Sequence, residues 1–399
     1  MEVSERAHTP YLPLELWLAV FDMIVNDCYL WLYLDADVTK RITLHALCLT
    51  CSAWVPYVRA GLYRDIKIES TTQSQKLTRT LMHFRPKNAE YIETLEYMFP
   101  GEGQISSSIL PPVKFPNLRT LALEFYEGQQ FGNFNLNVAR SLRHLLPALE
   151  ELSIDSFVEE KGPVSQFLRL VHAFPGIKKL KVMHVPPFTP PAQYTRVCKG
   201  KLGPSLCELE MQESGASDSS AFLSYLIQNT NTPHTLHTLH ITVTRCISDA
   251  IQGLNDFLEV CGPTLKYLHL KAASGSWLPM SERTRNYVVD LQHNYKLGHL
   301  RLDLYRVFHD ETLSWYLDIL ATVRAGNLVV ELDKVEVEVD STNTLEPALL
   351  NMNVSKLTVR AGLSPFVGQS KPRIWEMFPK IHKLGILEGH SMHALEETG

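Results

Sequence analysis

Cysteine and histidine are the residues of this chain whose spacing comes closest to that of a metal site. Cys48 and Cys51 have the CxxC spacing of paired zinc ligands, but zinc needs four ligands and no second pair lies at a suitable distance in the sequence. His234, His237 and His240 follow one another at every third residue. In a strand this spacing sends successive side chains to opposite faces, so the three imidazoles cannot meet at one ion. We interpret the cysteines as buried helix residues and the histidines as solvent-facing strand residues, and we expect no metal.

Short catalytic motifs are also missing from the sequence. It contains no Gly-x-Ser-x-Gly elbow, no His-Glu-x-x-His helix and no Gly-rich phosphate loop followed by Lys and Ser or Thr. The stretch from Gly215 to Asp218 lacks both a second glycine and a preceding strand. We therefore expect neither an enzyme nor a cofactor, although paired carboxylates that are distant in sequence would not show as a motif.

Composition excludes several other classes. The 399 residues include 38 Lys and Arg against 43 Asp and Glu, a net charge of −5 without a long basic run, which disfavours a nucleic-acid binder. Residues 28–34 form the longest uncharged apolar stretch near the amino end, and about 20 residues are needed to span a bilayer. No secretion signal is visible, and the seven cysteines are odd in number and widely spread. We expect no membrane association and a reducing, cytoplasmic or nuclear location.

A motif of the form apolar-x-x-Leu-x-apolar returns through most of the chain. Its last two positions lie two residues apart, as for two side chains on one face of a strand. In the seven regular copies the first position returns after 28 to 32 residues. Those copies are Leu118-Leu121-Leu123, Leu149-Leu152-Ile154, Ile177-Leu180-Val182, Leu206-Leu209-Met211, Leu236-Leu239-Ile241, Leu265-Leu268-Leu270 and Leu297-Leu300-Leu302, with further copies at Ile92-Leu95-Tyr97, Val354-Leu357-Val359 and Ile381-Leu384-Ile386 and a blurred one near Leu332-Val335-Val337.

Segments with helical spacing separate these strands, for example residues 164–173, 250–260 and 312–323. Strands that alternate with helices pair in parallel, because antiparallel neighbours need only a short turn. The sequence therefore predicts an α/β fold, a strand-helix solenoid with a parallel sheet. It resembles a leucine-rich-repeat protein with a unit of about 29 residues, at the long end of that class.

In such a solenoid the residue between the last two anchors of each copy faces the concave side. That column reads Ala122, Ser153, Lys181, Glu210, His240, His269, Arg301, Thr358 and Gly385. Its middle makes a mixed basic and aromatic patch, which fits an unknown protein substrate with an acidic stretch. A sheet face that is merely solvated is the alternative. The candidate substrate-binding residues are His240, Tyr267, His269, Lys271, His299, Arg301 and Asp303.

The first 68 residues lack the repeat and are rich in apolar side chains. Residues 14–25 include only Glu15 and Asp22 as polar residues, and residues 44–54 and 55–63 predict two more helices. A unit of about 55 residues buries only part of its own surface. We therefore expect its apolar excess to face the first repeats or another protein.

Four parts of this segment occur in the order found in an F-box and resemble that motif. They are Leu12-Pro13-Leu14-Glu15-Leu16, the pair Val20 and Ile24, the run Leu47 to Trp54 with its Cys51-x-x-Trp54, and Leu62-Tyr63. The chain is similar in particular to fungal F-box proteins with irregular leucine-rich repeats. Residues 26–43 make a longer link than is usual between the first two helices; it either extends the partner surface or lengthens the first helix.

The resemblance implies a non-catalytic substrate-recognition subunit of a Skp-cullin-F-box type ubiquitin ligase. The F-box would dock on a Skp-type adaptor and through it on a cullin, and the repeats would bind the substrate. A leucine-rich-repeat scaffold without ligase function is the alternative. We expect a tail at residues 1–8, an F-box-like helical domain at 9–68, the solenoid at 69–390 and a tail at 391–399. On the resemblance, the adaptor-binding residues are Leu12, Pro13, Leu16, Val20, Ile24, Leu47, Cys51 and Trp54, although some of these must belong to the domain's own core.

Overall fold

The structure is a computed structural model of the whole chain, and it describes the parts that form the helices, the strands and most of their short connections. The described residues are 16, 19–20, 36–50, 54–99, 110, 112–125, 136–156, 164–183, 205–212, 216–243, 248–272, 288–303, 310–335, 339–352, 354–361, 375 and 378–391.

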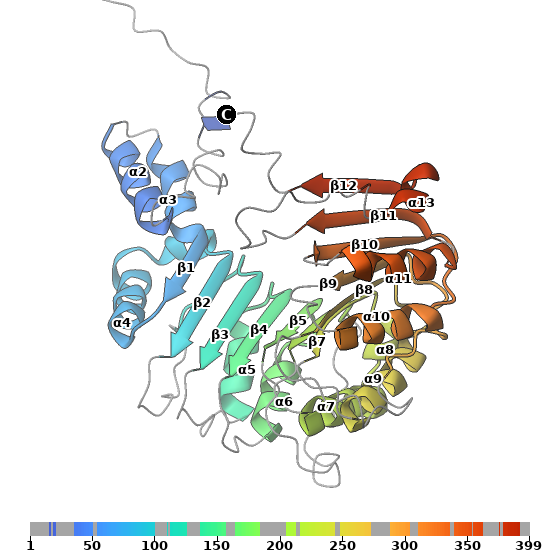
Figure 1. Cartoon of the computed structure of the whole chain (residues 1–399). Coiled ribbons are helices and arrows are strands. Elements are labelled where there is room, and N and C mark those ends of the chain that lie inside the picture. The colour runs from blue at the N-terminus through green and yellow to red at the C-terminus, as the bar shows by residue number, and fades with distance from the viewer. Residues whose placement is uncertain are drawn as a thin grey trace, which may run out of the picture.

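The described strands form one parallel sheet of twelve strands in which spatial order follows sequence order. The sheet curves, and α5 to α11 cover its outer, convex side (Figure 1). The strands are β1 Asp65–Ile68, β2 Thr94–Phe99, β3 Thr120–Phe125, β4 Glu151–Ser156, β5 Lys179–Val182, β6 Glu208–Gln212, β7 Thr238–Val243, β8 Tyr267–Ala272, β9 His299–Asp303, β10 Leu328–Val335, β11 Val354–Ala361 and β12 Leu387–Ser391. This arrangement confirms the prediction of an α/β fold with a parallel sheet, and it is compatible with a strand-helix solenoid.

Helices fill most of the connections between strands. The outer helices are α5 Leu136–Leu145, α6 Val164–Ala173, α7 Ala216–Asn229, α8 Thr232–Thr235, α9 Ser248–Cys261, α10 Asp310–Thr322 and α11 Val339–Leu350, and α13 Pro379–Lys383 precedes the last strand. At the amino end lie α2 Ala36–Thr50, α3 Val55–Arg64 and α4 Thr71–Arg79, followed by a π-helical turn at Thr80–Phe84 and a 3₁₀ turn at Pro86–Tyr91. The helices predicted at 164–173, 250–260 and 312–323 correspond to α6, α9 and α10.

One continuous apolar core lies between the sheet and the outer helices. It runs from Ile68 to Ile381 and contains the predicted anchors of the seven regular copies, all of them buried. A close approach of α7 and α9 tightens this layer at Gly253, where an added Cβ would lie 2.9 Å from the Cα of Ser220. The repeat therefore produces two layers, a sheet of Leu-x-Leu strands and a row of outer helices, with the apolar core between them.

Backbone hydrogen bonds fix the register at the start of most strands. The carbonyl oxygen of one residue in each of several repeats accepts two N–H donors from the next repeat; Glu93, for example, accepts from Arg119 and Thr120, and Arg119 in turn accepts from Glu150 and Glu151. The same step recurs up to Lys266, whose oxygen accepts from Gly298 and His299. Backbone hydrogen bonds therefore connect each of these repeats to the next.

Two of the predicted copies have the wrong register. In β10 Val330 and Leu332 align with Leu300 and Leu302, so Leu332 is the last anchor of its unit and not the first. Residues 330–332 and residues 335–339 each alternate apolar and polar side chains, so the sequence offers two positions for the strand that lie five residues apart.

The last copy is shifted as well. Leu384 caps α13 and is 62% exposed, and Gly385 adopts a left-handed φ of 71°, so the helix ends there and the strand starts two residues later. Glu388, and not Gly385, aligns with Thr358.

The amino-terminal helices differ from the predicted ones in their bounds. Helix α2 begins at Ala36, so part of the link predicted at 26–43 is helical, and the predicted third helix corresponds to α3. The sheet begins with β1 at Asp65, whereas the predicted helical domain extended to residue 68. Of the predicted first helix, at 14–25, only Leu16, Ala19 and Val20 are among the described residues, and all three are helical.

Candidate functional site

The concave face of the sheet carries the predicted substrate-binding patch. Along each strand buried anchors alternate with half-buried residues, which face away from the outer helices. Register places His240, His269 and Arg301 side by side on β7, β8 and β9, with Tyr267 and His299 paired two residues closer to the strand starts. The structure therefore places His240, His269 and Arg301, the middle of the predicted column, next to one another.

Four rings of this patch are in contact across neighbouring strands. The ring centroid of Tyr267 lies 5.2 Å from that of His240 and 4.7 Å from that of His299, and the ring planes are tilted against each other. The Nδ1 atoms of His240 and His269 are 3.3 Å apart, and these two rings are nearly perpendicular. We call His240, Tyr267 and His299 the ring row.

Burial determines the protonation state of two of these imidazoles. Desolvation lowers the pKa of His269 to about 4, with the positive charge of Arg301 as the next cause. Desolvation also lowers the pKa of His240, against the opposing effect of Glu208 and Glu210. Both rings are therefore neutral at pH 7 and add no positive charge to the patch.

Cations of the concave face are paired with carboxylates on adjacent strands. Lys179 lies 3.5 Å from Glu151 and 3.1 Å from Glu208, and Lys181 lies 2.9 Å from Glu210. Farther along the sheet His299 hydrogen-bonds Glu331 at 3.1 Å, and Arg301 pairs with Asp333. These carboxylates supply the negative charge that an acidic ligand would otherwise provide.

Sequence reasoning missed four of these partners, namely Glu151, Glu208, Glu331 and Asp333. Glu331 and Asp333 lie on β10, where the predicted register was wrong, so neither was assigned to the concave face. Glu208 occupies the position before an anchor, in register with Lys179. A correct register of β10 would have revealed Glu331 and Asp333, whereas Glu151 and Glu208 were missed because the predicted column took only the residue between the last two anchors.

Two other predicted contact residues occupy different environments. Lys271 is half-buried and lies next to Asp303 in register. Asp303 is only 4% exposed, and its backbone oxygen accepts a hydrogen bond from the Tyr316 hydroxyl. Asp303 therefore presents little surface to a ligand.

The second candidate surface lies on α2 and α3, which share a small apolar cluster. Leu44 and Val58 are buried in it, and Leu47, Cys48, Trp54 and Leu62 pack against them. Of the predicted adaptor-binding residues, Leu47 and Trp54 thus contribute to the core of the helix pair.

The other face of α2 exposes large apolar side chains. Ile42 is 64% exposed and Leu49 is 89% exposed, and their spacing of seven residues places them on one side of the helix. Tyr57 on α3 is also exposed, as are Leu16 and Val20. We call Ile42, Leu49 and Tyr57 the apolar face of α2–α3. The predicted adaptor-binding residues Leu12, Pro13, Ile24 and Cys51 lie outside the described residues.

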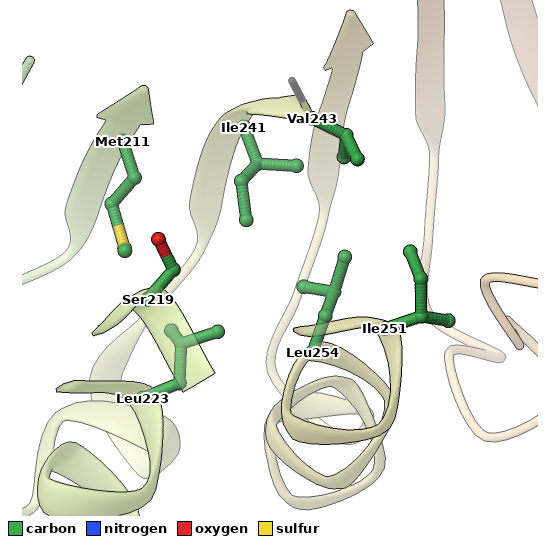
Figure 2. Close-up of a pocket in the computed structure, with 7 residues that line it drawn as sticks. All are labelled: Met211, Ser219, Leu223, Ile241, Val243, Ile251 and Leu254. Atoms are coloured by element: carbon green, nitrogen blue, oxygen red, sulfur yellow. The ribbon is translucent and has the colours of Figure 1, made fainter. Parts of the chain in front are cut away.

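A small pocket lies between β6 and β7 of the sheet and helices α7 and α9 (Figure 2). Its lining is apolar except for Ser219, whose hydroxyl points into it and has no hydrogen-bond partner. The apolar lining residues are Met211, Leu223, Ile241, Val243, Ile251 and Leu254. One hydroxyl cannot orient a substrate, so we regard this pocket as a packing defect of the core.

Within the described part of the chain, no group of three or more His, Cys, Asp or Glu side chains is arranged to hold a metal ion. A search of the same residues finds no helix that is both long and apolar enough to cross a membrane. No protein-family model matches the sequence, and no curated protein is detectably similar to it.

Proposed function

We propose that this chain is a non-catalytic substrate-recognition subunit of a Skp-cullin-F-box type ubiquitin ligase. Its amino-terminal helices dock on a Skp-type adaptor, which connects it to a cullin, and its repeats bind a protein substrate. Holding the substrate near the ubiquitin-charged enzyme raises the effective concentration of the acceptor lysine, so the chain needs no reactive group of its own.

The observation that carries this proposal is the apolar face of α2–α3, which the chain leaves exposed although it has a large core a short distance away. Leu49 is 89% exposed and Ile42 is 64% exposed. Most of their apolar surface remains in contact with water, which is unfavourable in free energy. A partner that covers them explains why these residues are apolar. Their position in the segment that resembles an F-box favours a Skp-type adaptor as that partner.

The test is co-expression of the full chain with a Skp-type adaptor and a cullin, followed by size-exclusion chromatography. The informative variant is Ile42→Asp with Leu49→Asp, because both side chains are exposed and their replacement leaves the Leu44–Val58 cluster intact. Trp54 is less suitable, because it packs against that cluster. We expect the wild type to form a ternary complex and the variant to lose at least about 100-fold in adaptor affinity, as for a buried apolar hot spot.

Leu384→Asp is the matched control, since this exposed leucine lies after α13 at the other end of the sheet. The control should bind the adaptor as the wild type does. A wild-type chain that is soluble and indifferent to the adaptor would refute the ligase assignment and favour a protein-binding scaffold.

A further inference from the structure

Another exposed surface lies at the amino-terminal end of the sheet, on α4 and the two turns that follow it. Helix α4 contacts β1, and the π-helical and 3₁₀ turns lead from it toward β2 (Figure 1). Between Glu69 and Glu90 the chain has no acidic residue, although its net charge is −5. The same stretch carries four exposed cations, namely Lys76, Arg79, Arg85 and Lys87. We call these four residues, together with the exposed Met82 and Phe84, the α4 patch.

The four cations form no ion pair with a carboxylate of the described residues. Three carboxylates that flank the stretch pair with cations outside the patch; they are Glu69, Glu93 and Glu96. Asp65 and Glu90 remain, and four cations against two carboxylates leave an excess of two positive charges. The cations around the ring row of the concave face, in contrast, pair with carboxylates of adjacent strands. The α4 patch therefore keeps a local positive charge in a chain whose net charge is negative.

The π-helical turn at Thr80–Phe84 places an apolar ring among these cations. In an uninterrupted α-helix, Phe84 would lie on the side of Leu77 and Leu81, which pack in the core. The wider π turn changes this register, and Phe84 is 65% exposed. Turns of this kind occur frequently at functional sites.

Apolar and basic side chains adjoin one another in the patch. The Arg79 guanidinium lies over the Phe84 ring, 5.5 Å from its centroid. Lys76 precedes Arg79 by three residues and lies on the same side of α4. Met82, in the π-helical turn, is also exposed. Exposed apolar groups beside unpaired cations fit a ligand that carries both carboxylates and a large apolar side chain, because each part of that ligand gains a partner.

We propose that the α4 patch binds an acidic segment of a partner protein, with an apolar side chain of that segment on Met82 and Phe84 and its carboxylates on the surrounding cations. An anionic membrane surface offers a similar combination of charge and apolar groups. The net charge of −5 repels such an extended anionic surface, whereas a short segment contacts only the patch. The inference goes beyond the proposed function, because the patch lies outside the apolar face of α2–α3.

A random peptide library, displayed on phage and selected on the immobilised full chain at neutral pH, tests the proposal. The test variant is Lys76→Gln with Lys87→Gln, because both side chains are exposed and their replacement leaves Phe84 in place. The matched control is Lys266→Gln with Lys296→Gln. These two lysines are exposed before β8 and β9, far along the sheet, and their replacement changes the net charge equally.

We expect Asp and Glu, together with large apolar residues, to be enriched in peptides selected on the wild type and on the control. By fluorescence anisotropy, a selected peptide should bind the test variant about tenfold more weakly and Phe84→Ser about fivefold more weakly. Its affinity should fall as salt is added, because the charges are exposed. The absence of acidic enrichment, an equal loss in the control, or undiminished binding to the test variant would overturn the proposal.

Sedimentation with vesicles that contain phosphatidylserine tests the membrane as the ligand. Vesicle binding that is lost in the test variant, without selection of acidic peptides, would assign the patch to a membrane and overturn the proposal. Circular dichroism of each variant beside the wild type shows that the variants are folded.

The adaptor experiment separates this proposal from the ligase assignment. The test variant should form the adaptor complex as the wild type does, since the apolar face of α2–α3 is unchanged. Acidic peptides that bind a chain indifferent to the adaptor would support the α4 patch and refute the ligase role. A chain that binds the adaptor and selects no acidic peptides would do the reverse.

Discussion

The repeat sheet and the amino-terminal helices bury their apolar side chains to very different extents. The sheet and its outer helices share one core from Ile68 to Ile381, which repeats the same strand-helix contact. Helices α2 and α3 share a cluster with only Leu44 and Val58 buried, while Leu49 is 89% exposed. Each repeat adds apolar contacts to the next, whereas the helix pair meets the repeats through α3, which contacts β1 and the 3₁₀ turn at Pro86–Tyr91.

This difference separates two uses of apolar side chains. In the repeats, alternation within a strand divides each element into a buried anchor row and a concave row that is free to vary. Helix α2 carries large apolar side chains on both faces, and α3 covers only one of these faces. An apolar residue of the repeats therefore contributes mainly to stability, whereas we expect an exposed apolar residue of α2 to contribute mainly to binding.

The largest expected effect contrasts one core residue with one residue of the apolar face. Phe257 on α9 is fully buried, so Phe257→Ala should lower the free energy of unfolding by about 3–5 kcal/mol. Leu49→Ala should change it by less than about 0.5 kcal/mol, because the side chain is already in water. Urea unfolding followed by circular dichroism measures both values. A comparable loss in the two variants would show that α2 packs on the repeats in solution.

The regular repeats could be predicted from the sequence because a Leu-x-Leu strand bounded by helices allows a single register. Strands β3 to β9 match the predicted anchors for this reason. At β10 two short alternating runs lie five residues apart and the wrong one was chosen, and in β12 a glycine cap moved the strand start. These errors depend on helix ends and strand pairing, which a one-dimensional motif does not contain.

The candidate surfaces were predictable only in outline. The concave column identified His240, His269 and Arg301 as neighbours, but the charge that compensates Arg301 comes from Asp333, 32 residues away on the misregistered strand. In the amino-terminal helices the sequence showed an excess of apolar residues, but it did not show which of them are buried in the helix pair and which are exposed. Tertiary packing places Leu47 and Trp54 against the inner cluster and leaves Leu49 outside.

A pH-dependent change in stability, of intermediate size, is expected from His269 on the concave face of the repeat sheet. Burial lowers the pKa of His269 to about 4, below its ordinary value near 6.5, so the unfolded chain takes up a proton in this window and the folded chain does not. Stability contributed by the neutral ring is full above pH 6.5 and is lost as the pH falls from 6.5 toward 4.

The variant His269→Gln removes this contribution. After allowance for the partial exposure of the ring, it should lose about 1 kcal/mol less stability than the wild type between pH 7 and pH 5. Urea unfolding at both pH values measures the difference. His237→Gln is the control, because this histidine is exposed, and it should follow the wild-type profile. An identical pH dependence in wild type and His269→Gln would show that the ring is solvated and that the concave face is more open than described.

The smallest effect tests how completely the repeat core is packed. Ser219 is 5% exposed and its hydroxyl faces the apolar pocket of Figure 2 without a hydrogen-bond partner, so the folded state carries the cost of desolvating it. Ser219→Ala removes that cost and leaves only a slightly larger void, so we expect a gain of about 0.5 kcal/mol in urea unfolding. Ser355→Ala is the matched control, because the Ser355 hydroxyl donates a hydrogen bond to the Leu328 oxygen at 3.1 Å. Its removal should not stabilise the chain. If Ser219→Ala were destabilising instead, a water molecule bound to the hydroxyl would account for it, and the core at β6 and β7 would be hydrated where the lining residues predict a dry pocket.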